Sequence, residues 1–134
     1  PGWYCYSPSD RRWGRPGLVY DFMAAAQDWA AAYDWPAIGV GDISLKYGGE
    51  ISGHASHELG VDVDIRPVRN DTIGSTTIYS STYSSERTKI LITQYIKPHL
   101  DVKVIFFNDP AINNPLSYVQ YWDNHDNHFH VRVY

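Results

Sequence analysis

The chain has 134 residues, enough for one hydrophobic core, and we expect a single domain spanning residues 1–134. Its formal net charge is −4, with 11 Lys and Arg against 15 Asp and Glu, so nucleic acid is not an expected partner. No apolar run approaches the roughly 20 residues that cross a bilayer, and no membrane span is expected. The one cysteine, Cys5, excludes an internal disulfide and a thiolate zinc site, and we expect it to be a small buried residue.

The first part of the chain predicts an arm, a helix and a strand. Residues 1–15 are aromatic and rich in turn residues, so we expect them to pack as an arm on the domain. Apolar residues recur at helical spacing over residues 16–33; Pro16 suits the first turn and Pro36 ends the helix. Residues 37–45 alternate weakly, which indicates a short strand.

Two segments alternate strictly between apolar and polar residues, as half-buried strands do. Residues 61–65 place Val61, Val63 and Ile65 on one face and Asp62 and Asp64 on the other. Residues 128–134 place Phe129, Val131 and Val133 toward the core and His128, His130 and Arg132 away from it. Both strands therefore present polar, chemically versatile side chains on one face.

The remaining segments complete an α+β pattern. Residues 66–84 form a long polar loop, of the kind that is often functional in compact domains. Residues 86–97 predict a second helix with Ser85 as its N-cap, and residues 102–107 predict a buried strand. Two helices and several short strands indicate an α+β domain.

Five of the six histidines fall in two tight clusters, at residues 53–57 and 125–130. Catalytic zinc sites without thiolates use imidazole and carboxylate ligands, usually three, and leave a position for water. Asp64 on one strand, a histidine just before that strand, and His128 or His130 on the other strand would supply such a set. The His-x-x-x-His spacing of helical zinc peptidases is absent.

The run Gly-His-Ala-Ser-His-Glu-Leu-Gly-Val-Asp-Val-Asp-Ile at residues 53–65 resembles the penicillin-insensitive murein endopeptidases, the MepA-type family of the LAS zinc metallopeptidases. Further segments agree in order: residues 13–19, 38–43, 105–112 with Asp109 as an inserted residue, and 125–132. The resemblance implies a LAS-type core, a small antiparallel sheet flanked by helices. It also implies hydrolysis of D-alanyl to meso-diaminopimelate cross-links in peptidoglycan by a zinc-activated water.

Site residues carry over from the resemblance position by position. It implies one Zn²⁺ per chain held by His57, Asp64 and His130, with His128 as the catalytic histidine. His54 and His125 match further active-site histidines. Asp62 shares the strand face of Asp64, and we expect it to hydrogen-bond a ligand histidine and fix its tautomer.

Departures from the family pattern keep other functions open. The loops at residues 66–85 and after Ala111 are short, and Arg66, Arg69 and Arg132 are candidates for binding a substrate carboxylate. Peptidoglycan peptides are the expected substrate; the alternatives are a D-Ala carboxypeptidase or dipeptidase, a secreted endopeptidase of broader specificity, and a non-enzymatic wall-binding module. Pro1-Gly2-Trp3 is not a native translation start, so we expect a processed or trimmed chain, and the N-terminus does not indicate the compartment. The resemblance implies a periplasmic or secreted location, with a signal or pro-segment absent from this chain.

Overall fold

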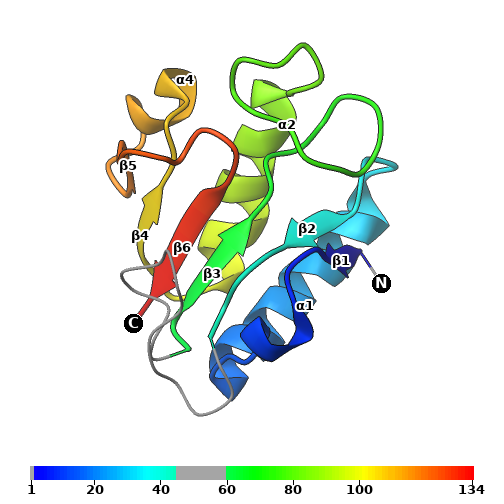
Figure 1. Cartoon of the computed structure of the whole chain (residues 1–134), viewed down its shortest axis with the longest axis vertical. Helices are drawn as coiled ribbons and strands as arrows, with labels where there is room; N and C mark the ends of the chain where they lie inside the picture. Colours follow the sequence, from blue (N-terminus) through cyan, green and yellow to red (C-terminus); the bar gives the residue numbers. More distant parts are fainter. Residues whose placement is uncertain (1, 45–59) are drawn as a thin grey trace.

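A computed structural model describes residues 2–44 and 60–134. These residues form one six-stranded sheet in the order β1-β2-β3-β6-β4-β5 (Figure 1). The strands are β1 (Trp3–Cys5), β2 (Ile38–Val40), β3 (Asp62–Ile65), β4 (Val102–Phe106), β5 (Val119–Gln120) and β6 (Phe129–Val133). The helical segments are η1 (Ser9–Arg11), α1 (Pro16–Ala32), α2 (Ser85–Ile90), η2 (Leu91–Ile96), α3 (Lys97–His99) and α4 (Pro110–Asn113).

The sheet is mixed, which corrects the expectation of an antiparallel sheet. The three central pairings, β2–β3, β3–β6 and β6–β4, are antiparallel as predicted. Each edge strand is instead parallel to its neighbour, β1 to β2 and β5 to β4. These edges are short segments of two or three residues, too short to show an alternating pattern in the sequence.

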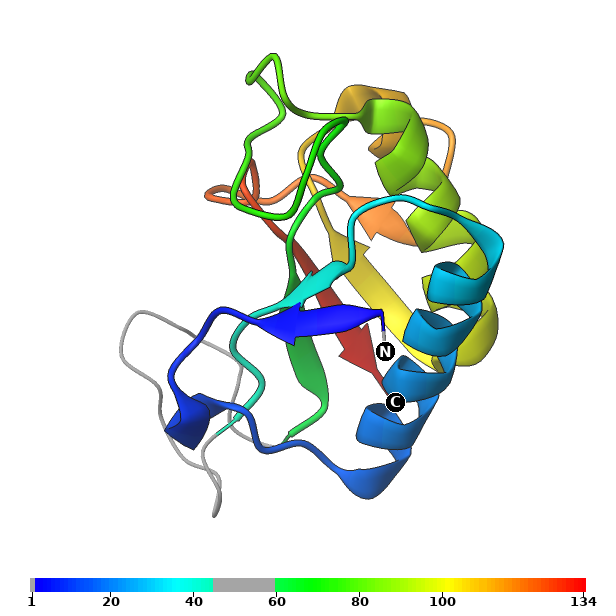
Figure 2. The same ribbon diagram turned by 90° about the vertical axis from the view of Figure 1, so that its right-hand side faces the viewer.

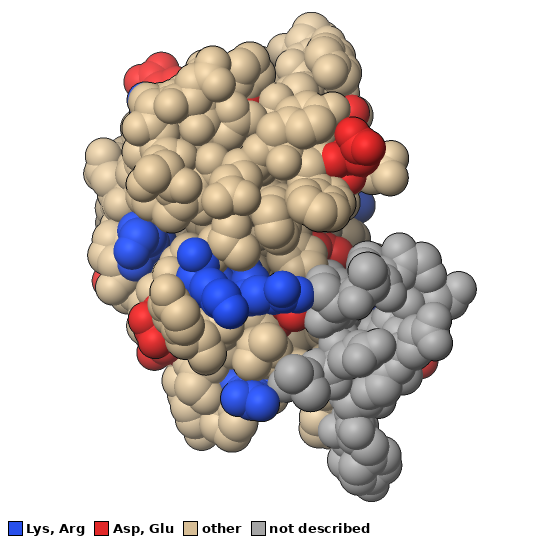
Figure 3. Space-filling model, turned by 90° about the vertical axis from the view of Figure 1, so that its left-hand side faces the viewer, with Lys and Arg blue, Asp and Glu red and all other residues tan. Residues whose placement is uncertain are grey.

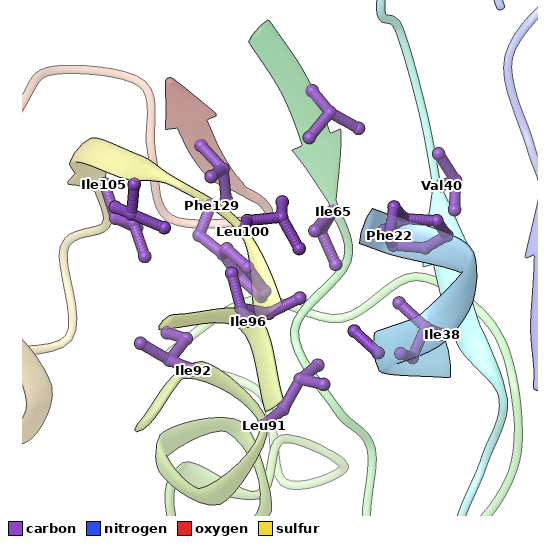
Figure 4. Packing of buried hydrophobic residues seen from close by; sticks show 14 of the residues in the cluster. Phe22, Ile38, Val40, Ile65, Leu91, Ile92, Ile96, Leu100, Ile105 and Phe129 are labelled. Carbon is purple, nitrogen blue, oxygen red and sulfur yellow. The ribbon is translucent and has the colours of Figure 1, made fainter. Parts of the chain in front are cut away.

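Helices α1, α2 and α3 lie on one face of the sheet and leave the other face without cover from these three helices (Figure 2). Leu91, Ile92 and Ile96 of the second helical segment point toward Ile65 and Phe129 of the sheet (Figure 4). Val63 and Ile65 belong to this core, so the alternation of β3 places Asp62 and Asp64 on the opposite face. The fold thus builds its core on one side of β3 and β6 and its polar site on the other.

Helix α1 follows the prediction closely. Pro16 occupies its first turn and the helix ends at Ala32, well before Pro36. Trp29 is 1% exposed and contacts the rings of Tyr33, Trp35 and Tyr95. This aromatic group packs α1 against η2.

The second helix differs from the prediction at both ends. Its N-cap is Ser84, whose hydroxyl accepts a hydrogen bond from the amide of Arg87, rather than Ser85. Ser85 instead donates to the carboxylate of Asp109 at 2.6 Å. The helix continues through a π-helical stretch, η2, to His99; this wider turn lies directly before Pro98, whose ring would clash with the carbonyl four residues earlier in a regular α-helix.

Other differences lie in the arm and in β4. The predicted arm contains β1, and Cys5 is exposed there, so the expectation of a buried cysteine is wrong. Strand β4 is not buried throughout: Val102 and Ile105 are buried, Lys103 is exposed, and the other two positions are half-buried. No helix among the described residues is long and apolar enough to span a membrane.

Candidate active site

The candidate site lies where β3 and β6 pair on the open face of the sheet. Cross-strand register puts Asp62 opposite Arg132 and Asp64 opposite His130. Directly opposed residues of antiparallel strands have Cβ atoms about 4.5–5.5 Å apart, so each acidic side chain has a cationic or titratable neighbour. The backbone pairing therefore assembles four polar side chains from two strands that are more than sixty residues apart in the chain.

His130 lies between two carboxylates and is 6% exposed. Its Nε2 is 2.7 Å from Asp62 Oδ1, and its Nδ1 is 3.2 Å from Asp64 Oδ1. Burial alone would lower the pKa of His130, but hydrogen bonds to the two carboxylates and their charges outweigh burial and raise this pKa from 6.5 to about 9. In the metal-free protein at neutral pH, His130 is therefore an imidazolium that bridges two aspartates.

Asp62 is the fully buried anchor of this arrangement, with 0% exposure. Besides His130, it accepts a hydrogen bond from Arg132 Nε at 2.8 Å. Burial raises the pKa of Asp62, but the hydrogen bonds from His130 and Arg132 outweigh burial and hold the pKa below its ordinary value. Asp62 thus stays ionised and fixes the orientation of the His130 ring.

His128 and His125 complete a histidine cluster beside Asp64. His128 Nδ1 is 2.7 Å from the side-chain oxygen of Asn127, and His128 Nε2 is 3.7 Å from Asp64 Oδ1. An amide oxygen only accepts hydrogen bonds, so the Asn127 contact puts the proton of neutral His128 on Nδ1 and leaves Nε2 as the basic nitrogen. The ring of His125 lies 4.7 Å from that of His128, and its Nδ1 contacts the carbonyl oxygens of Trp122 and Asp123.

The donor atoms of Asp64 and His130 suit a zinc ion. Zinc with bonds of about 2.0–2.1 Å in tetrahedral geometry places two ligand atoms roughly 3.3 Å apart. His130 Nδ1 and Asp64 Oδ1 are 3.2 Å apart. The other ring nitrogen, Nε2, contacts Asp62, and metal-binding histidines commonly contact a carboxylate in this way. The nitrogen and oxygen donors at this point therefore fit the metal that the resemblance implies.

The predicted site residues fall into two groups. The structure brings Asp62, Asp64, His125, His128 and His130 together, whereas His54 and His57 lie outside the described residues. Within residues 2–44 and 60–134, no group of three or more His, Cys, Asp or Glu side chains is placed to hold a metal. The ligand roles of His57, Asp64 and His130 therefore stay predictions. His99 lies apart from the site and contacts Asp28 of α1 at 2.7 Å.

Comparison with protein families addresses the first three quarters of the chain. The family model of the penicillin-insensitive murein endopeptidases matches residues 2–99. The chain belongs to this family. Membership implies a peptidase that acts on murein. No curated protein matches the chain.

The family match includes β3 with Asp62 and Asp64 and ends before the second histidine cluster. The structure adds that β6 places His130 of that cluster opposite Asp64 of the matched segment.

A pocket of about 490 Å³ opens from Asp64 and His128 across the open face. Its wall includes Tyr6, Arg11 and Asn127, none of which was predicted as a site residue. Asn127 lies inside the second histidine cluster, and this position in the sequence could have identified it as a candidate site residue. Tyr6 and Arg11 gave no such signal, since they come from the N-terminal arm and reach the site only because β1 pairs with β2.

The surface on the side of β4 and β5 is largely uncharged (Figure 3). Among the described residues, the Lys and Arg side chains on this face gather in a small group next to acidic side chains (Figure 3). An extended basic area, as nucleic-acid binding would require, is not seen on this face of the described part of the chain.

Proposed function

We propose that this member of the endopeptidase family is a zinc-dependent hydrolase that cleaves D-alanyl to meso-diaminopimelate cross-links of peptidoglycan. The observation that carries the proposal is the 3.2 Å approach of His130 Nδ1 to Asp64 Oδ1 at the end of an open pocket. Family membership supports the substrate class. We infer that the enzyme works where murein is found, in the periplasm or outside the cell.

Zinc would be held by His57, Asp64 and His130. When bound, it supplies Lewis acidity that polarises a peptide carbonyl and brings the pKa of water from about 15.7 toward about 7. Binding requires His130 Nδ1 to lose its proton, while Nε2 keeps its proton and donates it to Asp62. Asp62, itself held by Arg132, thereby fixes the tautomer that Nδ1 coordination needs.

His128 is the proposed proton carrier. Its Nε2 faces Asp64 Oδ1. The other ring nitrogen, Nδ1, carries the proton and donates it to the side-chain oxygen of Asn127 in a hydrogen bond. An imidazole with a reference pKa of about 6.5 can accept a proton from water and return it to the leaving amine near neutral pH. His125, whose ring contacts that of His128, orients or shares this proton transfer, and His54 is proposed to contact substrate or a ligand.

The first experiment is elemental analysis of metal content, with lysis of bacterial sacculi measured on the same sample before and after chelation. Close to one zinc per chain and chelator-sensitive lysis support the proposal, and product mass spectrometry then identifies the bond. Release of D-alanine from monomeric muropeptides indicates a carboxypeptidase instead. Cleavage of casein without lysis of sacculi indicates a broader endopeptidase, and zinc without any hydrolysis indicates a binding module.

Substitutions separate the ligand role from the catalytic role. His57→Ala, Asp64→Ala and His130→Ala should each lose zinc and activity together. His128→Ala should keep zinc and lose most activity, and His99→Ala is a matched control because His99 lies on α3 away from the pocket. Full activity in His128→Ala would show that the proton transfer has been assigned to the wrong histidine.

A further inference from the structure

The arginines near the pocket differ in how their charges are balanced. Arg11 contacts Asp42, Arg69 forms a two-point pair with Asp71, and Arg132 contacts Asp62. Arg66 also lines the pocket, but within the described part of the chain its partners are aromatic side chains. The pocket thus holds a guanidinium whose charge is not matched by a carboxylate among the described residues.

Two tyrosines hold Arg66 in place. Its guanidinium lies 3.9 Å from the centre of the Tyr6 ring, and Arg66 donates a hydrogen bond to the Tyr4 hydroxyl at 3.4 Å. Stacking on an aromatic face leaves the edge of the guanidinium, with its fork of N–H donors, available for a planar anion. The side chain is therefore ordered before any ligand arrives.

The sheet makes room for this clamp with two glycines. At Gly39, a Cβ atom would lie 2.7 Å from the Tyr4 hydroxyl oxygen, and at Gly41 a Cβ atom would collide with the Tyr6 ring. Gly39 and Gly41 are two residues apart around β2, so both open the same face. The Tyr4 and Tyr6 rings thus cross the sheet to reach Arg66 only because both positions lack a side chain.

Arg66 is close to the proposed centre. Asp64 and Arg66 are two residues apart along an extended segment, which separates their Cα atoms by about 6.6–6.8 Å. Both residues line the pocket. The Tyr6 hydroxyl lies close enough to Asp64 and Arg66 for both charges to affect its pKa. Its burial and then the charge of Asp64 raise the pKa of Tyr6, and the charge of Arg66 acts in the opposite direction.

We propose that Arg66, clamped by Tyr4 and Tyr6, binds a free carboxylate carried by the substrate residue that contributes the scissile nitrogen. Asp64 and Arg66 line the same pocket, so a substrate whose scissile bond lies at Asp64 can present a neighbouring carboxylate to Arg66. In a D-alanyl to meso-diaminopimelate cross-link, the carbon that bears the acylated amine carries such a carboxylate. This inference rests on the proposed function, and it adds the chemical feature by which the site selects its substrate.

The test compares a ligand that has this carboxylate with one that lacks it. Zinc-loaded protein is titrated with N-acetyl-D-alanyl-D-alanine and with its C-terminal amide, and chromatography of the same samples follows any turnover. If either peptide is cleaved, KM and kcat replace the dissociation constants. We expect the free acid to bind at least tenfold more tightly than the amide, because a carboxylate pairs with the guanidinium through two acceptor oxygens and an opposite charge, whereas the amide offers one neutral acceptor.

Arg66→Gln should bind both peptides equally weakly while retaining its zinc, and Arg66→Lys, which keeps the charge but not the fork, should retain part of the preference. Arg87→Gln is the matched control, because Arg87 also stacks on an aromatic ring, Trp35 at 4.8 Å, away from the pocket. Equal affinity of the wild type for acid and amide, or an unchanged preference in Arg66→Gln, would overturn the inference. An Arg66-dependent preference without cleavage of muropeptide dimers would refute the endopeptidase function and leave the carboxylate site standing.

Discussion

Replacing Asp62 by asparagine tests whether the buried carboxylate orients a zinc ligand. The change preserves the shape of the side chain and removes its charge. Asp62 accepts hydrogen bonds from His130 Nε2 at 2.7 Å and from Arg132 Nε at 2.8 Å, both on Oδ1. Asparagine is neutral and has one acceptor oxygen beside an NH₂ group, so both donors lose their charged partner.

Two magnitudes follow from these contacts. A hydrogen bond to a charged group contributes about 1.5–3 kcal/mol and a neutral one about 0.5–1.5 kcal/mol, so weakening two bonds lowers the free energy of unfolding of the metal-free protein by about 2–3 kcal/mol. Loss of a carboxylate beside a ligand histidine typically lowers metal affinity by about 10–100-fold. The substitution also lowers the pKa of His130, which reduces competition by protons and partly offsets the loss at neutral pH.

The assay is a competitive zinc titration of Asp62→Asn and wild type at several pH values, with urea unfolding of both metal-free proteins. The affinity loss should be largest near pH 9, where protons compete least for His130. Asp71→Asn is the control, because Asp71 forms a comparable two-point pair with Arg69 on an exposed loop. Unchanged zinc affinity at every pH in a folded Asp62→Asn protein would refute the orienting role.

Four further predictions concern proton linkage and packing. Since the metal-free pKa of His130 is about 9, zinc binding at pH 7 should release close to one proton from it, measurable by calorimetry in buffers of different ionisation heat. For the same reason its contribution to metal-free stability is complete below about pH 6.5 and disappears as the pH rises through about 9, which urea midpoints across this range will show. Trp29→Ala should lower the free energy of unfolding by about 3–5 kcal/mol in the same urea assay. Asp109→Ala should lower it by about 2–4 kcal/mol, because Asp109 caps α4 and accepts a hydrogen bond from Tyr83.

Strand identity in the site was predictable from the sequence, and strand pairing was not. Residues 61–65 and 128–134 alternate strictly, so the polar faces that carry Asp64 and His130 follow from a period of two. The register that places these two residues opposite each other depends on tertiary packing of β3 and β6 on the helices. Periodicity predicted that each strand carries candidate ligands, and only the fold shows that these two side chains meet.

The parts that the sequence did not predict are those made by short or distant contacts. Strand β1 has three residues, too few for an alternating pattern, and it forms because β2 offers an edge for pairing. Tyr4 and Tyr6 reach Arg66 across about sixty residues of chain, so the carboxylate clamp has no local signature. The choice between Ser84 and Ser85 as N-cap depends on Asp109, which attracts the Ser85 hydroxyl from another loop.

Charge balance explains why one strand register serves both the fold and the proposed metal site. Asp62 and Asp64 share one face of β3, and two buried like charges are unfavourable without cations beside them. Arg132 and protonated His130 provide those cations in the metal-free protein. When zinc replaces the proton on His130, a positive charge remains between the carboxylates, so binding needs no new pairing of strands. A one-residue slip of β6 would remove both cations and turn Val131 to the open face, and the same interactions therefore specify the fold and prepare the ligands.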